Sequence, residues 1–159
     1  MAKKVCFYGI LASLCMILGY LEHLVSLDFI APGIKLGLAN SVVLLLIARD
    51  DIKGAFLVNI VRILLSDLLF SAPSTLIYSF SAGMVSTFIM AIAFKSQKFS
   101  IIGFSVAGAT VHNITQLICA FLLLGVGVFY YFPLLLISAV ISGVIIGSLA
   151  KTVLKKIRF

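Results

Sequence analysis

The stretch PLLLISAVISGVIIGSLA, residues 133–150, contains no charged side chain over its whole length. A bilayer core about 30 Å thick is crossed by roughly 20 helical residues, and slightly shorter runs are tolerated. The stretch is therefore predicted to be a helix that spans a membrane. Its Gly143 and Gly147, with Ala139 one turn earlier, are the small residues that allow membrane helices to pack closely.

The remainder of the sequence repeats this pattern and predicts a single all-α domain, residues 1–159, embedded in a membrane as a compact bundle of six helices. The six apolar runs cover residues 5–21, 34–48, 55–70, 76–94, 101–124 and 133–150. Short connections with charged residues, Pro, Gly or tyrosine separate the runs. The composition agrees, since 63% of the residues are hydrophobic, 11% are charged, and the mean hydropathy is +1.29.

The positive charges predict the orientation of the helices. Ten of the twelve Lys and Arg residues lie in the N-terminal tail, in the second and fourth connections, and near the C-terminus. Cytoplasmic loops of membrane proteins are enriched in Lys and Arg, so both termini are predicted to be cytoplasmic, in a cell membrane with lipid around the bundle. Because the net charge of +7 is concentrated in these segments, it does not predict binding to nucleic acid.

Arg62 is predicted to lie near the middle of the third run. Asn59, Arg62 and Ser66 fall at helical spacing on one face, and Asp67 flanks that face toward the outer end. An ionisable side chain at this depth is costly, so it faces the bundle interior and finds a partner. Two roles stay open: a strut neutralised by Asp67 or by helix-end carbonyls, and a direct contact to a ligand.

The fifth run contains a second polar face, in the segment VHNITQ. His112 and Gln116 are one turn apart and Asn113 lies beside them, so three hydrogen-bonding side chains interrupt an apolar helix. These side chains either form hydrogen bonds inside the bundle or contact a ligand. No metal site or other cofactor is predicted, because neither the two histidines nor the three cysteines have ligand spacing.

The depths of these residues predict that they converge on a pocket that opens outward. Lys35 is predicted at the outer edge of the second run, either as an anchor to the headgroups or as a ligand contact. The pocket would bind a small molecule with an anionic or polar group and an apolar portion. The candidate ligand-binding residues are Lys35, Asn40, Arg62, Asp67, His112, Asn113 and Gln116.

The sequence lacks the motifs of two enzyme classes. Prenyl diphosphate synthases bind two diphosphates through magnesium held by DDxxD motifs, whereas DDIKG, residues 50–54, has no third aspartate. Asp50 and Asp51 are instead expected to be a solvated loop or a helix cap. A phosphate-binding GxxxxGK[ST] motif is also absent from the sequence, so any use of ATP would belong to partner subunits.

Three motifs together resemble one family of small membrane proteins. They are PGIKLGLAN (32–40), SFSAGMVSTFIM (79–90) and GFSVAGATVHNITQL (103–117). These motifs resemble heptaprenyl diphosphate synthase component I, also called the Gx transporter family, over nearly the whole chain. Two positions depart from that family: Ala82 stands where a second glycine is frequent, and Thr115 stands where glycine is usual.

The resemblance implies a fold like the substrate-capture (S) components of energy-coupling factor transporters in prokaryotic cell membranes. Such components bind a small metabolite from outside and associate with a membrane scaffold and two ATPases. They dock through small residues of the first helix, and in this sequence the resemblance points to Gly9 and Ser13. The glycines expected at helix contacts are Gly33, Gly37, Gly83, Gly108, Gly143 and Gly147. The alternatives are a non-catalytic membrane subunit of polyprenyl diphosphate synthesis and a scaffold of a membrane redox complex.

Overall fold

The computed structural model describes residues 2–24, 37–70 and 73–156, and these residues are helical almost throughout, without any β-strand. Most of the predicted runs match the observed helices to within a few residues, and residues 34–36 of the second run lie outside the described residues. The elements are α1 (Ala2–Leu24), α2 (Leu38–Ala48), α3 (Ile52–Phe70), α4 (Pro73–Lys95), α5 (Ile101–Leu124), the short 3-10 helix η1 (Val126–Tyr131) and α6 (Phe132–Lys156).

The long apolar helices of the described residues agree with a membrane-type, all-helical protein, and the number of six spans stays a prediction. Four stretches of the described residues are long and apolar enough to cross a membrane. They are Ala2–Glu22, Thr75–Lys95, Ile101–Leu123 and Gly127–Lys156. Helix α2 has 11 residues, which is about 17 Å at 1.5 Å per residue. Helix α3 has 19 residues, including Arg62 and Asp67, and is not among the four.

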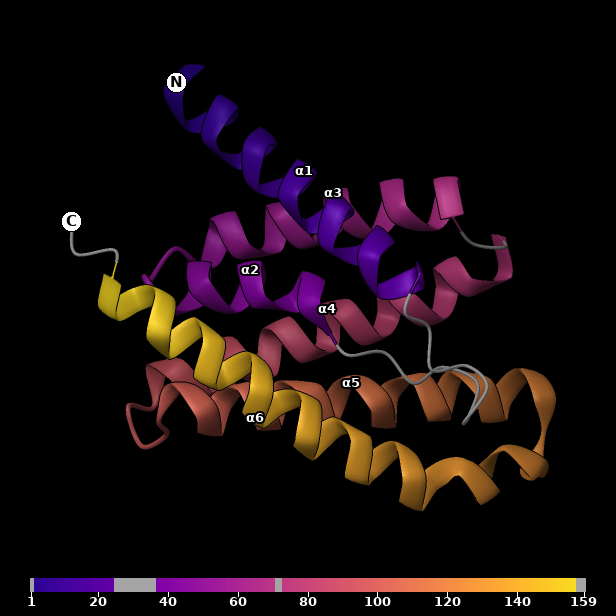
Figure 1. Cartoon of the computed structure of the whole chain (residues 1–159). Coiled ribbons are helices and arrows are strands. Elements are labelled where there is room, and N and C mark those ends of the chain that lie inside the picture. The colour runs from indigo at the N-terminus through magenta and orange to yellow at the C-terminus, as the bar shows by residue number, and fades with distance from the viewer. Residues whose placement is uncertain (1, 25–36, 71–72, 157–159) are drawn as a thin grey trace.

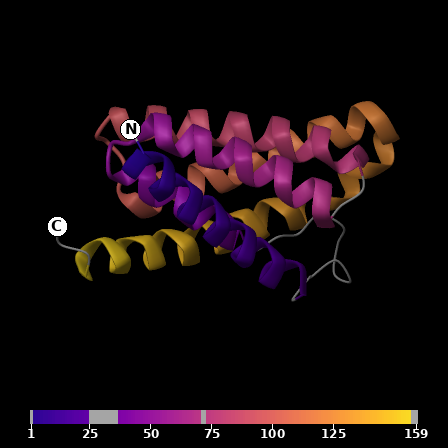
Figure 2. The same cartoon turned by 90° about the horizontal axis from the view of Figure 1, so that it is seen from above.

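The helices α3 to α6 follow one another in alternating directions, so that neighbours in sequence also pack side by side (Figure 1). The start of α1, the end of α6, and the α2–α3 and α4–α5 connections lie at the same end of the molecule. A second view agrees with this arrangement (Figure 2). Apart from Arg62, every Lys and Arg of the described residues belongs to these segments. The basic residues therefore gather at one end of the bundle, called here the basic end.

The core of the bundle is built around α2, which packs against α1, α3, α4 and α6. Its Val43 and Ile47 are fully buried, and Leu44 is nearly so. Most residues of α2 are apolar, so the helix can be covered on several sides, and here α1, α3, α4 and α6 cover it. A polar residue on α2, such as Asn40, therefore lies between several helices of the bundle.

Helix α3 begins with the cap that was predicted for the DDIKG segment. Asp51 Oδ1 accepts a hydrogen bond of 3.0 Å from the backbone N–H of Gly54, as expected for a residue at a helix N-terminus. The other oxygen, Oδ2, accepts a hydrogen bond of 2.7 Å from the hydroxyl of Tyr8 in α1. Asp51 thus fixes the start of α3 and joins it to α1 at the basic end.

Candidate functional site

Arg62 lies between two asparagine side chains that come from different helices. Its Nε donates a hydrogen bond of 2.8 Å to Oδ1 of Asn59, one turn earlier in α3. Its Nη2 donates a hydrogen bond of 2.6 Å to Oδ1 of Asn40 in α2. Hydrogen bonds from a charged donor are stronger than those between neutral groups, so this arrangement compensates part of the cost of placing a cation in the bundle.

Asn59 extends these contacts to α4 and is itself fully buried. Its Nδ2 donates to the hydroxyl of Thr87 at 2.8 Å and to the carbonyl oxygen of Gly83 at 3.0 Å. Helices α3 and α4 lie close together here. Glycine at position 83 makes this possible, since a Cβ there would collide with the side chain of Ile63. We call Arg62, Asn40, Asn59 and Thr87 the amide network.

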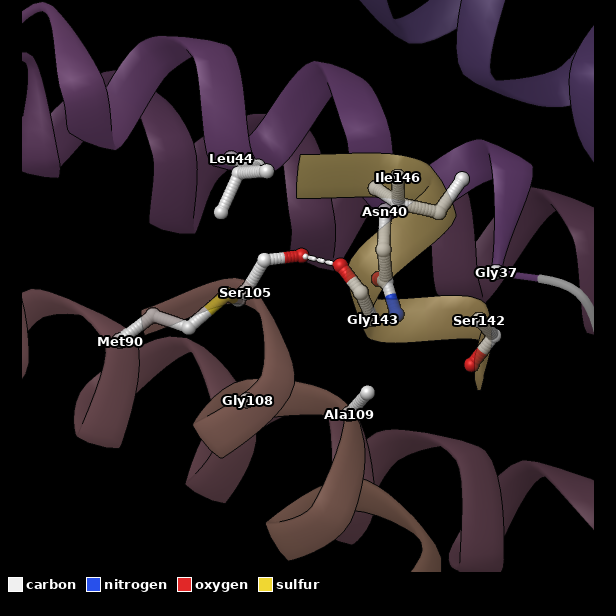
Figure 3. A pocket seen from close by; sticks show the side chains of 10 residues that line it. All are labelled: Gly37, Asn40, Leu44, Met90, Ser105, Gly108, Ala109, Ser142, Gly143 and Ile146. Carbon is white, nitrogen blue, oxygen red and sulfur yellow. Dashed lines mark hydrogen bonds between the residues drawn. The ribbon is translucent and has the colours of Figure 1, made fainter. Parts of the chain in front are cut away.

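The amide network determines which way each asparagine amide points. Arginine has only donors, so the group that faces Arg62 must be the amide oxygen in both asparagines. The NH₂ group then faces the opposite way. In Asn59 this group is used by α4, whereas Nδ2 of Asn40 has no acceptor among the residues that the structure describes. Figure 3 shows Nδ2 of Asn40 directed into a cleft.

This cleft lies between α2, α4, α5 and α6 and encloses about 300 Å³, including its open mouth. The space within it that is free to hold solvent is enough for about one water molecule. Its walls combine one amide, two hydroxyls and several apolar side chains. The lining residues are Gly37, Asn40 and Leu44 of α2, Met90 of α4, Ser105, Gly108 and Ala109 of α5, and Ser142, Gly143 and Ile146 of α6 (Figure 3).

The start of α2 is fixed by Gly37 and Glu22. Gly37 has φ 78°, a left-handed conformation that glycine adopts without the steric penalty of a Cβ. Its backbone N–H donates to Oε1 of Glu22, a buried residue near the end of α1. The sequence reasoning assigned no role to Glu22. The signal available for it was an acidic residue within an otherwise apolar helix end.

The cleft adjoins a contact at which the backbones of α5 and α6 lie close together. A Cβ at Gly143 would lie 2.7 Å from Cα of Val106, and a Cβ at Gly147 would lie 2.8 Å from Cα of Ile102. Only glycine allows the backbones of α5 and α6 to approach this closely. The hydroxyl of Ser105 donates to the carbonyl oxygen of Gly143 at 2.8 Å. We call the contact of Gly143 and Gly147 with α5 the glycine seam.

A model of the heptaprenyl diphosphate synthase component I family matches residues 11–153, which include the amide network, the cleft and the glycine seam. The chain belongs to the heptaprenyl diphosphate synthase component I family. This confirms the resemblance carried by the three motifs. The description of the family names one component, which implies partner subunits. A comparison with curated proteins and one with solved structures each gave no match.

The sequence left pairing of Arg62 with Asp67 open as one alternative, and the structure gives Arg62 other hydrogen-bond partners. Within the described residues, the guanidinium forms its hydrogen bonds with Asn40 and Asn59 rather than with Asp67. Asp67 is only 6% exposed and lies near enough for its charge to act on Arg62, but its Oδ2 has no hydrogen-bond partner among these residues. Five positions along an ideal helix correspond to about 140° of rotation, which separates the two side chains.

The polar face of α5 divides into separate environments. Asn113 donates a hydrogen bond of 2.8 Å to the carbonyl oxygen of Leu135 in α6 and borders a second cavity of about 180 Å³. His112 and Gln116 are half-buried, and neither is among the residues that line the cleft. Of the predicted ligand-binding residues in the described part of the chain, only Asn40 lines the cleft, and Arg62 contacts it through Asn40.

The predicted glycines also have different environments. Gly37 serves the backbone conformation, since a Cβ there would meet only Asn40, at 3.9 Å. Gly108 leaves space for the side chain of Met90, with which a Cβ would collide. On α1, Gly9 has nothing within 4 Å of an added Cβ. Lys35 and Gly33 lie outside the described residues, so their predicted roles stay predictions.

Proposed function

We propose that this protein is the membrane component of an uptake system, which binds a small metabolite from the outer side and acts with partner subunits. One observation carries the proposal: the half-buried cation Arg62, within an apolar helix bundle, orients Asn40 so that its amide N–H groups face a cleft between four helices. Buried polar groups in a membrane helix bundle mark substrate pathways, because their placement is costly. A concave, mostly apolar cleft with a few oriented polar groups is the usual form of a small-molecule site.

The proposal includes six membrane spans with both termini in the cytoplasm, like those of an S component. The gathering of Lys and Arg at the basic end supports this orientation, since cytoplasmic segments are enriched in these residues. Helix α3, with 19 residues, is about 29 Å long at 1.5 Å per residue, which is close to the thickness of a bilayer core.

The second candidate is a non-catalytic membrane subunit of polyprenyl diphosphate synthesis, which the description of the family favours. The contacts of Asp51 support a non-catalytic role. Both of its carboxylate oxygens are engaged, one by the backbone of Gly54 and one by Tyr8, so this residue is a cap and not part of a free magnesium-binding pair. A soluble synthase would then supply the chemistry.

Native mass spectrometry of the protein in lipid nanodiscs tests the proposal. We expect a bound small molecule in the wild type and in Arg49→Gln, and its loss in Arg62→Gln. Arg49 lies exposed at the basic end, so its variant controls for the removal of one positive charge. Size-exclusion chromatography and circular dichroism of Arg62→Gln separate loss of the ligand from loss of the fold.

Affinity purification from the native membrane separates the two candidate functions. An uptake component is expected to bring down a membrane scaffold and ATPase subunits, whereas a subunit of prenyl synthesis would bring down a soluble synthase. A preparation with no small molecule and no ATPase subunit would refute the uptake proposal.

A further inference from the structure

The cleft offers both a hydrogen-bond donor and hydrogen-bond acceptors, and no charged side chain of the described residues lines it. We propose that it binds an uncharged group in which a carbonyl acceptor adjoins an N–H or O–H donor, such as the edge of an amide or a lactam. The inference rests on the proposed function, names the substrate class of the same site, and selects the polar, uncharged alternative from the anionic or polar group expected from the sequence.

The donor in the cleft is Nδ2 of Asn40. Its orientation is fixed, since rotating the amide would place an NH₂ group against the donors of Arg62. The hydrogen bond of 2.6 Å that Oδ1 accepts from a guanidinium also polarises the amide, which strengthens the N–H groups on its other side. Arg62 is therefore a positioning residue. It does not contact the ligand with its own charge but directs the neutral donor Nδ2 of Asn40 into the cleft.

The acceptors in the cleft are the hydroxyl oxygens of Ser105 and Ser142. Each hydroxyl donates its proton to a backbone carbonyl: Ser105 to Gly143 at 2.8 Å and Ser142 to Ala139 at 3.2 Å. The lone pairs of both oxygens consequently remain to accept hydrogen bonds. A ligand that matches the cleft needs an acceptor for Asn40 and a donor for at least one of these serines.

A carboxylate fits this arrangement poorly because it has acceptors only. Next to Ser105 and Ser142 it would face other oxygen lone pairs, and transfer of an unpaired charge into an apolar site is costly. The apolar wall formed by Leu44, Met90 and Ile146 suits a ring or a hydrocarbon portion attached to the polar edge. The polar edge would face Asn40 and the two serines, and the ring would lie against this apolar wall.

Three probes of nearly the same shape test the inference: benzamide carries both a donor and an acceptor, benzoate has acceptors only, and benzamidinium has donors only. Binding to the full chain in nanodiscs is measured by saturation-transfer NMR and titration, with empty nanodiscs as the reference. We expect the wild type to bind benzamide at least about tenfold more tightly than benzoate or benzamidinium, because only benzamide satisfies Asn40 and the serines together.

Asn40→Asp provides the matched variant, because it keeps an oxygen for Arg62 and replaces the donor that faces the cleft by an acceptor. We expect its affinity for benzamide to fall about tenfold and its preference to change to benzamidinium. Gln97→Glu makes the same chemical change at an exposed position between α4 and α5 and is expected to leave all three affinities unchanged. An unchanged thermal midpoint of Asn40→Asp would exclude unfolding as the cause.

Tighter binding of benzoate than of benzamide would overturn the inference, as would an Asn40→Asp variant that binds benzamide like the wild type, or no binding of any probe. A preference for benzoate would not contradict the uptake function, because that function requires only that some small molecule is bound, and an anion would meet this requirement. The uptake function fails on a different result, namely the absence of any co-purified molecule and of ATPase subunits.

Discussion

The amide network and the glycine seam both join helices of the bundle, but they do so by different means. In the amide network, side-chain hydrogen bonds join α2, α3 and α4 around one cation. In the glycine seam, the absence of side chains brings the backbones of α5 and α6 into contact. The comparison shows that a seam of glycines fixes only a distance, whereas a hydrogen-bonded network also fixes the direction of a polar group.

The largest effect is expected from Gly143→Leu. A Cβ at this position would lie 2.7 Å from a backbone atom of Val106, which cannot move without the whole of α5. Overpacking commonly costs about 1–3 kcal/mol, and a leucine against backbone exceeds this range. We expect loss of the folded monomer in size-exclusion chromatography. Gly9→Ala, on an open face of α1, is the control and should elute like the wild type.

The next effect is expected from Asn59→Leu, which tests the amide network. The change removes the acceptor for Nε of Arg62 and the donor to Thr87, and each buried group left without a partner costs about 1–3 kcal/mol. We expect a marked fall of the thermal midpoint in detergent. A midpoint equal to that of the wild type would mean that the network directs Asn40 without stabilising the bundle.

A smaller effect is expected from Gly37→Ala, at the start of α2. The residue has φ 78°, and a left-handed backbone costs a residue with a Cβ about 1–2 kcal/mol. The neighbouring atoms leave space for the methyl group, so the expected fall in thermal midpoint comes from the backbone alone. A change in oligomeric state would contradict this explanation, because it would indicate that the new methyl group of Gly37→Ala disturbs the packing of the helices.

The smallest effect is expected from Ser105→Ala, which removes a single hydrogen bond across the glycine seam. Hydrogen bonds between membrane helices contribute about 0.6 kcal/mol on average, so the thermal midpoint should change little. Binding of benzamide should weaken measurably, because Ser105 also supplies an acceptor to the cleft. A large loss of stability with unchanged binding would reverse the roles that we assign to this residue.

Much of the helical architecture could be predicted from the sequence because it depends on local composition. The apolar runs 76–94, 101–124 and 133–150 lie within α4, α5 and α6, and a helix cap was one of the two roles expected for Asp51. The motifs in residues 32–40, 79–90 and 103–117 led to the correct family. Arg62 and Asn40 were singled out correctly as interior polar residues, since charged and amide groups are unusual in apolar helices.

The partners of these residues could not be predicted, because periodicity gives the face of a helix but not the helix that it meets. The sequence by itself determined that Arg62 needs polar partners in an apolar environment. Only the tertiary structure decided that these are Asn40 and Asn59 rather than Asp67, and that Asn113 contacts Leu135 at the α5–α6 interface. The physical reason is that helix packing sets which hydrogen bonds are within reach, and those bonds then orient the amide toward the cleft.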